Sequence, residues 1–500
     1  MVLTFQRVNK MYMRNIYLDR NYYLNNRSRF NYFYNILLTY KIRKNNKLFI
    51  KNNINYLDDK LDYYQKKSIL VDDNTLLIAG AGSGKTTTII NKIKYLVEDK
   101  HINEKDILCL SFTSNTVNEL KERISYNIDI YTFHKLAMEI LEDHNIYFGI
   151  SSDYLEYIID ELFYKYDLDY FKKIINSFIN LFKQKNHKDD KLSKLSNKSI
   201  LLKLINEIYI IYENELYSQG LLDFNDLINK CIEIIKSKGL KRYYKYIIID
   251  EYQDISYERY ILIKTIKDIC DSKIFAVGDD YQSIYAFSGS DINMFLKFKK
   301  YFGYSKIIKL NNTYRNSQEL SNISRRFILM NRTQIFKRIN SIKRNNKPIK
   351  IIYYINNQDI LLKRLLSTVT SDITILVRNK KDIHKIKSPE VDITDTEIIY
   401  DDKHIKYYTV HKSKGLEFEN VLILNLEDSF LGFPNKMKNH EIFKYINVKD
   451  TSIKEERRLF YVALTRSKNN VYLFVNKNKP SIFVKELLLE SKKHIEVISL

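Results

Sequence analysis

Short apolar runs alternate with amphipathic stretches along much of the chain. The runs Thr75 to Ala79 and Ile107 to Phe112 are almost entirely apolar, which is typical of strands buried on both faces. Amphipathic stretches follow each run, one beginning at Lys85 and one spanning Thr116 to Ile124, and these predict helices. Strands that alternate with helices indicate a doubly wound α/β fold with a parallel sheet.

The pattern changes in the middle of the chain. Between residues 136 and 240 apolar and basic residues mix at helical spacing, and the strand-like pattern resumes at Tyr246. We therefore expect a helical subdomain inserted into the first α/β domain, and a second α/β unit from near Ile307. Its strand-like runs are Ile349 to Tyr354, Ile373 to Val377, Val421 to Leu424 and Val471 to Phe474.

The first fifty residues carry many Arg and Lys and a single acidic residue, Asp19. This composition is typical of an organellar presequence, of a nucleic-acid-binding arm, or of an extension of biased composition without a function. The expected division is a basic extension over 1–55, a first α/β domain over 56–135 and 241–300, a helical subdomain over 136–240, and a second α/β domain over 301–500.

The net charge of +22 favours a polyanionic partner such as nucleic acid. However, 41 Tyr and no Trp indicate an AT-rich coding sequence, which itself raises the lysine content. Cys109, Cys231 and Cys270 lie far apart and are odd in number, so they fit a reducing compartment and supply neither a zinc site nor an iron–sulfur ligand set. No apolar run approaches the ~18 residues of a membrane helix, so we expect a soluble protein with no membrane partner. It would be cytoplasmic or nucleoid-associated, or in an organelle matrix or the nucleus if the basic extension is a targeting segment.

The segment Leu77-Ile-Ala-Gly-Ala-Gly-Ser-Gly-Lys-Thr86 predicts a phosphate-binding loop between a strand and a helix. Lys85 would reach the β- and γ-phosphates of ATP, and the Thr86 hydroxyl would hold Mg²⁺. The first position of the general pattern is Ala79 instead of Gly. The residues expected around the phosphates are Gly80, Ala81, Gly82, Ser83, Gly84, Lys85, Thr86 and Thr87.

A second run, Tyr246-Ile-Ile-Ile-Asp-Glu-Tyr-Gln-Asp254, predicts a buried strand that ends in carboxylates. Asp250 would complete the Mg²⁺ site with Thr86, and Glu251 would polarise the attacking water. In isolation such a run is more often a solvated acidic turn. Together with the phosphate loop it indicates an ATP-hydrolysing site.

Further segments resemble the motifs of superfamily 1 helicases of the UvrD/Rep type, in the family's order, over residues 61 to 475. The matching segments are Leu61 to Gln65, Ser111 to Thr116 with Glu119 to Arg123, Tyr131 to His134, Gly278 to Gly289, Leu310 to Arg315, Tyr408 to Phe418 and Glu455 to Arg466. Leu221 to Leu227 also resembles the family, and we expect a structural role for it.

The resemblance implies a role for individual residues. Gln65 would read the adenine edge and Tyr314 would stack on the base. Gln282 would sense the γ-phosphate, while Arg315 and Arg466 would reach it across a cleft. Glu417 would contact the ribose. The single-stranded DNA would be contacted by Phe112, Thr113, Asn115, His134, Tyr285, Phe287 and His411, where aromatic side chains allow stacking without sequence preference.

The chain departs from the family pattern in two places. Ser288 stands where the family usually has an arginine, after Phe287 in place of a tryptophan, so coupling between ATP and the strand is expected to be weaker. About 30 residues separate Asn379 from Tyr408, fewer than the ~50 that a further helical domain needs. We therefore expect the large helical insertion of the second domain to be absent.

These observations predict an ATP-dependent translocase on single-stranded DNA and a 3′ to 5′ DNA helicase, with the direction implied by the resemblance alone. Its cofactors would be ATP and Mg²⁺, and its partners single-stranded or partially duplex DNA and proteins of repair, recombination or replication. Two alternatives stay open, namely an RNA-directed motor and an ATP-gated nucleic-acid-binding scaffold without unwinding activity.

Overall fold

The computed structural model describes residues 57–58, 60–151, 153–164, 168–185, 189–369, 371–401, 403–446 and 453–499. The chain forms two units, Met1–Val71 and Asp72–Leu500. In the first unit, helix α4 (Tyr63–Leu70) begins with a capping box, in which the Asp62 N–H donates to Gln65 Oε1 at 2.9 Å. The basic extension predicted over 1–55 lies outside the described residues.

The first lobe of the second unit contains a six-stranded parallel sheet in the order β3-β2-β6-β7-β1-β8. Its four central strands are buried almost throughout because helices cover both faces, as their apolar sequences predict. The strands are β1 (Thr75–Ala79), β2 (Ile107–Ser111), β3 (Asp129–Thr132), β6 (Tyr246–Ile249), β7 (Lys273–Gly278) and β8 (Lys306–Leu310).

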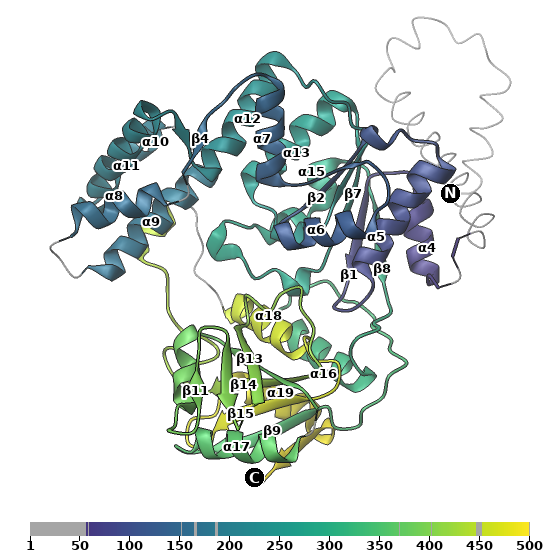
Figure 1. Ribbon diagram of the computed structural model, residues 1–500, viewed down its shortest axis with the longest axis vertical. Coiled ribbons are helices and arrows are strands. Elements are labelled where there is room, and N and C mark those ends of the chain that lie inside the picture. The colour runs from purple at the N-terminus through teal and green to yellow at the C-terminus, as the bar shows by residue number, and fades with distance from the viewer. Residues whose placement is uncertain are drawn as a thin grey trace, which may run out of the picture. The chain divides into compact units, whose positions relative to one another are not determined.

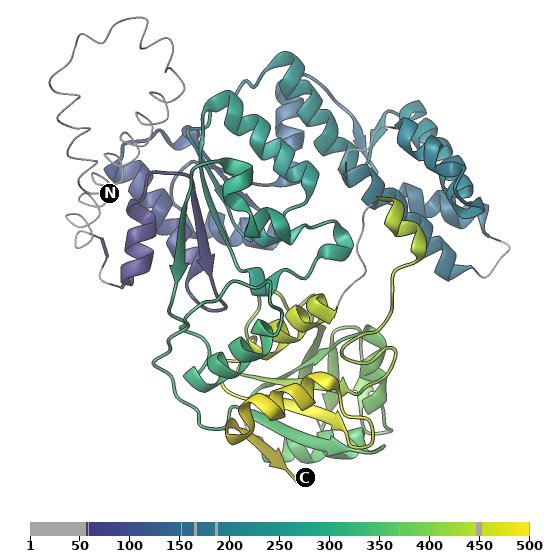
Figure 2. The same ribbon diagram turned by 180° about the vertical axis from the view of Figure 1, so that it is seen from behind.

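Helices lie on both faces of this sheet (Figures 1 and 2). On one face α7 (Phe133–Asp143), α12 (Phe224–Lys238) and α13 (Tyr257–Cys270) bury their apolar sides against the strands. The other face carries α5 (Lys85–Lys94) and α6 (Ser114–Arg123). Shorter elements of this lobe are η1 (Tyr95–Asp99), η2 (Glu104–Asp106), η3 (Tyr252–Asp254), η4 (Asp280–Gln282), η5 (Ala286–Ser288), α14 (Ile292–Leu296) and α15 (Phe298–Phe302).

Strand β8 corrects one expectation from the sequence. We expected the run near Ile307 to open the second α/β unit, with the boundary at residue 301. Instead β8 pairs in parallel with β1, with Thr75 opposite Lys306 and Ala79 opposite Leu310. The run therefore closes one edge of the first sheet, and the crossing to the second lobe follows it.

Four helices between β3 and β6 pack around an apolar core of their own, which we call the helical cluster. They are α8 (Tyr154–Leu162), α9 (Asp169–Gln184), α10 (Asp189–Ser196) and α11 (Ile200–Ser218). A parallel pair of short strands, β4 (Gly149–Ile150) and β5 (Leu221–Leu222), lies at its base. The cluster is narrower than the predicted range of 136 to 240, because α7 and α12 pack on the first sheet.

The second lobe contains an eight-stranded sheet in the order β11-β12-β13-β10-β14-β15-β9-β16. It is parallel except at the β11-β12-β13 edge. The runs predicted in this lobe are strands, so that part of the sequence pattern is confirmed. The strands are β9 (Ile349–Tyr354), β10 (Ile373–Val377), β11 (Asp392–Ile393), β12 (Glu397–Tyr400), β13 (Lys403–Thr409), β14 (Asn420–Leu426), β15 (Val471–Asn476) and β16 (Ile495–Ile498).

Two apolar layers enclose this sheet. One contains α16 (Gln318–Leu329), α18 (Ile453–Leu464) and α19 (Ile482–Ser491), and the other contains α17 (Gln358–Thr368) and η6 (Lys380–Ile386). A 3-10 turn, η8 (Lys492–His494), precedes β16. The described residues between Asn379 and Tyr408 form η6 and the antiparallel edge of the sheet. Within the described parts of the chain, no helix is both long enough and apolar enough to cross a membrane.

The connection from β14 to α18 reaches the helical cluster. Its 3-10 helix η7 (Glu441–Ile446), which we call the strap, buries Ile442, Phe443 and Ile446 in the core of that cluster. The Phe443 ring lies 5.9 Å from the Phe178 ring, and the Lys185 ammonium donates to the Ile446 carbonyl. The strap thus attaches the second lobe to the helical cluster (Figure 2).

Two segments join the lobes, residues 311–317 before α16 and residues 330–348 after it, and we call them the hinge segments. They run together at Asn312 and Asn340, and the Thr313 N–H donates to the Asn340 carbonyl at 2.8 Å. The Thr313 hydroxyl also donates to the Ala81 carbonyl at 2.8 Å. The hinge is therefore fixed to the loop that follows β1.

Candidate nucleotide site between the two lobes

The loop between β1 and α5 has the backbone that a phosphate cradle requires. Gly82 and Gly84 have left-handed φ angles of 66° and 79°, which residues with a Cβ rarely adopt. A Cβ on Gly82 would lie 2.5 Å from the Cβ of Arg315, so the hinge approaches the loop too closely for a side chain. Lys85 begins α5, where unpaired backbone N–H groups favour an anion.

The acidic pair follows β6 and faces this loop. Glu251 adopts a left-handed φ of 50°, and its carboxylate lies 3.2 Å from the Lys85 ammonium. Burial opposes the charged form of Glu251, but Lys85 and then Lys414 outweigh it and lower the carboxyl pKa to about 2. Glu251 is therefore an anion at neutral pH. It is suited to orient a water molecule by accepting a hydrogen bond.

Arginines from the second lobe and the hinge complete the site. Arg466, just after α18, donates to Gln282 Oε1 at 2.9 Å and to the Leu416 carbonyl at 3.1 Å. Burial, and then the nearby charge of Arg315, lower the pKa of Arg466 to about 9. Arg315 pairs with Glu417 at 3.0 Å and lies 11% exposed. Two guanidinium groups so close together favour a bound anion between the lobes.

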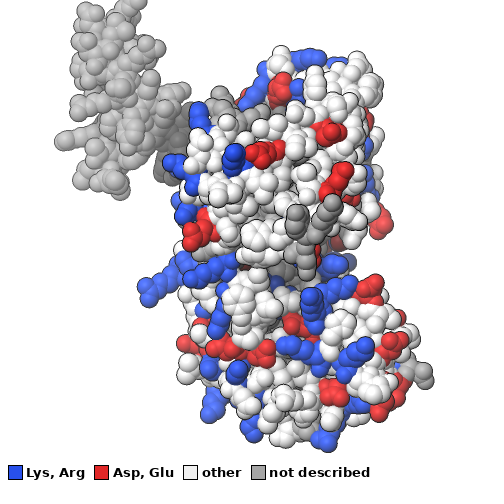
Figure 3. Space-filling model, turned by 90° about the vertical axis from the view of Figure 1, so that its left-hand side faces the viewer, with Lys and Arg blue, Asp and Glu red and all other residues white. Residues whose placement is uncertain are grey.

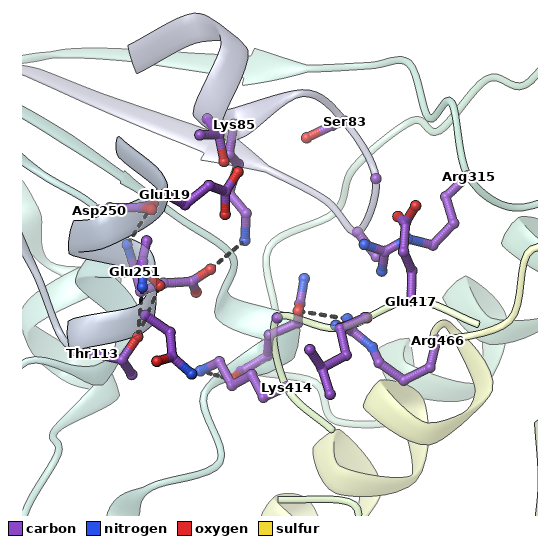
Figure 4. Close-up of a pocket in the computed structure, with 18 of the residues that line it drawn as sticks. Ser83, Lys85, Thr113, Glu119, Asp250, Glu251, Arg315, Lys414, Glu417 and Arg466 are labelled. Atoms are coloured by element: carbon purple, nitrogen blue, oxygen red, sulfur yellow. Dashed lines mark hydrogen bonds and ion pairs between the residues drawn. The ribbon is translucent and has the colours of Figure 1, made fainter. Parts of the chain in front are cut away.

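These groups line one cavity of about 920 Å³, and Figure 4 shows Lys85 and Glu251 on one side of it with Arg315, Glu417 and Arg466 on the other. The cavity brings together most of the residues predicted for ATP. Those lining it are Ala81, Gly82, Ser83, Gly84, Lys85, Thr86, Thr87, Asp250, Glu251, Gln282, Tyr314, Arg315, Glu417 and Arg466. Gly80 lies behind the loop, where its carbonyl accepts from the Ser83 hydroxyl at 2.9 Å. Gln65 belongs to the first unit, and its role stays a prediction.

The cavity also fits the predicted Mg²⁺. Thr86 and Asp250 both line it and offer hard oxygen ligands. Burial, and then the charge of Glu251, raise the pKa of Asp250 to about 7, so a cation at this carboxylate would relieve an unfavourable charge. The described residues hold no cluster of three or more His, Cys, Asp or Glu side chains suited to a metal. A Mg²⁺ ion at Thr86 and Asp250 would take one carboxylate and would otherwise be held by water and nucleotide phosphates.

The residues predicted to contact DNA fall into two groups. Tyr285, Phe287 and His411 form one aromatic cluster, with ring centroids 5.4 to 6.3 Å apart. Burial, and then the charge of Arg378, lower the pKa of His411 to about 4, so its ring is neutral at pH 7. The Lys414 ammonium lies 4.8 Å from the Tyr285 ring centroid.

The second group lies at the ends of β2 and β3. Phe112 packs on Phe133, with ring centroids 5.1 Å apart, and the Arg259 guanidinium lies over both rings. His134 packs against Phe224 at 4.9 Å. Thr113 and Asn115 line the nucleotide cavity, as do Tyr285 and His411. The structure thus places four of the seven predicted DNA contacts beside the nucleotide cavity.

Sequence reasoning gave no role to several residues that line this cavity, and Lys414 and Glu119 are two of them. The Lys414 ammonium pairs with Asp254 and donates to the Gln282 carbonyl at 2.9 Å, which ties the second lobe to the acidic strand end. Glu119 on α6 also lines the cavity. Lys414 and Glu119 lie inside motif-like segments, but their spacing along the sequence gives no sign of what they meet.

A phosphate loop after the first strand, a buried acidic pair and arginines supplied by a second α/β lobe define a P-loop NTPase with two RecA-like lobes. Comparison with protein families then places the chain more closely. The model of the UvrD/REP helicase N-terminal domain matches residues 61–303, and that of the UvrD-like helicase C-terminal domain matches residues 390–478. The chain therefore belongs to the UvrD/Rep family of ATP-dependent DNA helicases, and the resemblance found in the sequence is confirmed.

Curated relatives are similar over different shares of their length. The chain is 26% identical to DNA helicase IV of Escherichia coli (strain K12), over 85% of this chain and 69% of that protein. It is 30% identical to DNA helicase II of Rickettsia typhi, over 60% of this chain and 49% of that protein. It is 26% identical to a probable DNA helicase of Mycoplasma pneumoniae, over 88% of both. The chain thus spans about half the length of the Rickettsia relative and most of the Mycoplasma one.

Proposed function

We propose that the protein is an ATP-dependent translocase on single-stranded DNA that separates duplex DNA in the 3′ to 5′ direction, in repair, recombination or replication. The observation that carries this proposal is the single cavity lined by the phosphate loop of one lobe and Arg466 of the other. An arginine from the second lobe stabilises charge on the transferred phosphoryl group only while the lobes are closed on the nucleotide. Hydrolysis would then be tied to lobe movement.

The proposed roles within the cavity follow from its chemistry. Lys85 and the loop amides hold the phosphates, Glu251 orients the attacking water, and Arg315 and Arg466 stabilise the developing charge. Mg²⁺, held by Thr86 and Asp250, would neutralise charge on the phosphate oxygens. Gln65 and Tyr314 would hold the adenine, and Glu417 the ribose, as the family resemblance implies.

The proposed path of the strand runs along the two aromatic groups. Tyr285, Phe287 and His411 lie next to the cavity, so a shift of the lobes would move the surface on which bases stack. In the view of Figure 3, Lys and Arg side chains gather where the upper and lower parts of the picture meet. Such a surface would bind phosphates and make affinity fall with increasing salt.

A second candidate is an ATP-gated scaffold that binds nucleic acid without unwinding it. It is favoured by Ser288, whose exposed hydroxyl only donates to the Tyr285 carbonyl of its own turn at 3.0 Å and offers no cation to a strand. The aromatic cluster beside the cavity favours the motor, because a scaffold needs no contact between strand and nucleotide.

Steady-state ATP hydrolysis by the purified protein separates these functions. The reactions contain no nucleic acid, single-stranded DNA or single-stranded RNA, with Lys85→Ala as the background. Strong stimulation by DNA that disappears in Lys85→Ala supports the DNA motor, and stronger stimulation by RNA supports an RNA-directed motor. Slow hydrolysis that neither polymer changes supports the scaffold. Unwinding of 3′-tailed but not 5′-tailed duplexes then tests the direction.

A further inference from the structure

A lysine from the hinge is completely buried beside the nucleotide site. Lys337, in the hinge segment 330–348, has a side chain that is 0% exposed, and its ammonium contacts the carboxylates of Asp279 and Asp280. The Asp280 contact measures 2.6 Å, and the ammonium lies 3.6 Å from the centroid of the Tyr281 ring. An ammonium at this depth is stable only because it is fully paired.

Asp279 connects this lysine to the predicted γ-phosphate sensor. Its Oδ1 accepts from Lys337, and its Oδ2 accepts from Gln282 Nε2 at 2.7 Å. On the other side of the same amide, Gln282 Oε1 accepts from Arg466 Nη2 at 2.9 Å. A continuous chain of hydrogen bonds therefore runs from the hinge through Asp279 and Gln282 to Arg466.

We propose that Lys337 and Asp279 are positioning residues, which fix the orientation of the Gln282 amide so that its oxygen faces Arg466 and the nucleotide cavity. This inference rests on the proposed ATP hydrolysis. It adds a hinge residue to the machinery that senses the nucleotide.

The proposal follows from the directions of the hydrogen bonds. Both oxygens of Asp279 accept hydrogen bonds, one from Lys337 and the other from Gln282, so the group of Gln282 that faces Asp279 is its donor. The amide nitrogen of Gln282 is therefore held toward Asp279, which turns the amide oxygen toward Arg466. If the amide were reversed, its nitrogen would face the Arg466 guanidinium, and two donors would oppose each other. Lys337 holds Asp279 in place, because its ammonium donates to the other oxygen of that carboxylate.

The neighbouring carboxylate provides a matched control. Asp279 and Asp280 are both 0% exposed and both pair with Lys337. Asp280 otherwise accepts hydrogen bonds from the Ile335 N–H at 2.8 Å and from Gln334 at 3.2 Å. Replacing either by Asn removes one buried charge at constant size. The replacement changes the hydrogen-bond partner of Gln282 only at Asp279. An Asn at this position would turn its oxygen toward Lys337 and its NH₂ group toward the amide nitrogen of Gln282, so that two donors would face each other.

The experiment compares Asp279→Asn with Asp280→Asn in the full chain. For each variant we would measure the melting temperature, the KM for ATP, and kcat with and without single-stranded DNA. We expect similar changes in melting temperature for the two variants. We expect Asp279→Asn to lower the DNA-stimulated kcat by roughly ten- to a hundredfold with little change in KM, because the reacting groups are displaced and not removed. Asp280→Asn should keep most of the wild-type kcat.

Equal values of kcat in the two variants would overturn the proposal. A loss of kcat in Asp279→Asn that is explained by a lower melting temperature than that of Asp280→Asn would overturn it as well. A wild-type protein that does not hydrolyse ATP would instead refute the proposed function itself, so the two failures are distinguishable. If Asp279→Asn does not fold, Lys337→Arg and Lys337→Met replace it. A folded Arg variant should retain the kcat and a folded Met variant should lose it, whereas equal kcat values in both would contradict the role of the positive charge.

Discussion

Replacing the buried Lys183 by Met tests how the helical cluster is held to the first lobe. The Lys183 ammonium lies 2.6 Å from Glu213 on α11, 2.7 Å from Asp223 and 2.6 Å from Asp226 at the start of α12, and its side chain is 3% exposed. Burial opposes its charge, but the three carboxylates outweigh burial and raise its pKa. Methionine has a similar length and leaves those carboxylates facing one another without a cation.

The expected loss can be worked out from these contacts. Removing one partner of a buried ion pair costs about 3–5 kcal/mol, because the remaining charge stays buried. The variant can avoid part of this cost by binding a proton, and Asp226 would bind it, since burial and then the charge of Asp223 raise its pKa to about 7. Relative to an unfolded aspartate with its ordinary pKa of about 4, binding that proton at pH 7 costs about 4 kcal/mol, so the two estimates agree.

The pH dependence has a definite sign. In the variant the folded carboxylates have raised pKa values, so the folded state binds more protons than the unfolded state between the unfolded aspartate pKa of about 4 and neutral pH. Stability relative to the wild type is then regained as pH falls. The deficit of Lys183→Met should shrink by about 1.4 kcal/mol per pH unit between pH 7 and pH 5 for each proton that the folded variant binds beyond those bound by the folded wild type.

Hydrogen exchange at α9 and α11 measures the local loss of stability in Lys183→Met, without assuming that the whole chain unfolds in one step. The control is Lys172→Met on the same helix, which removes an ion pair of 2.9 Å with Asp160 on α8, whose side chain is 58% exposed, and it should cost less than about 1 kcal/mol. Adding Asp226→Asn to Lys183→Met should restore part of the protection. Unchanged exchange at pH 7, or an equal loss at pH 7 and pH 5, would refute the reasoning.

Three further substitutions test other contacts. Gly82→Ala should lower kcat/KM for ATP by about tenfold or more, because its Cβ would lie 2.5 Å from that of Arg315; normal kinetics in a folded variant would show that the loop can move away. Ser288→Arg should increase the stimulation of hydrolysis by DNA, and unchanged stimulation would mean that this position does not couple strand and nucleotide. Phe443→Ala should speed hydrogen exchange in the strap, since removing a buried Phe ring costs about 3–5 kcal/mol, and unaltered exchange there would show that the ring does not hold it.

Local patterns in the sequence predict the individual elements well. The run Thr75–Ala79 is apolar after its first residue and is buried throughout, and the run Ile349–Tyr354 is interrupted only by Lys350 and is mostly buried, so burial fixes both as strands. The phosphate loop is equally local, because its glycines are needed for left-handed φ angles within five consecutive residues. These features depend on neighbours along the chain.

Pairings between distant residues could not be read in this way. The sequence of the run at Lys306 would suit the last strand of the first sheet or the first strand of the second. Only its pairing with β1 shows that it belongs to the first sheet. Lys337 meets Asp279 across 58 residues, and Lys414 meets Asp254 across 160. In a chain with 82 Lys and Arg, nothing local distinguishes a buried lysine from the many exposed ones.

The strap constrains how the lobes can move. Opening the nucleotide cavity separates Arg466 from Gln282, and if the helical cluster stayed fixed to the first lobe, the strap would have to leave it. Exposing Ile442, Phe443 and Ile446, all buried in that cluster, would cost about 1.5–3 kcal/mol each. That total is comparable to the ~5.5 kcal/mol of differential binding needed to reverse a two-state equilibrium. ATP binding alone would then barely supply it. The strap can stay docked only if the helical cluster turns relative to the first lobe, and that movement strains the contacts of Lys183 with Asp223 and Asp226. We therefore expect the strap and Lys183 both to oppose opening of the cavity.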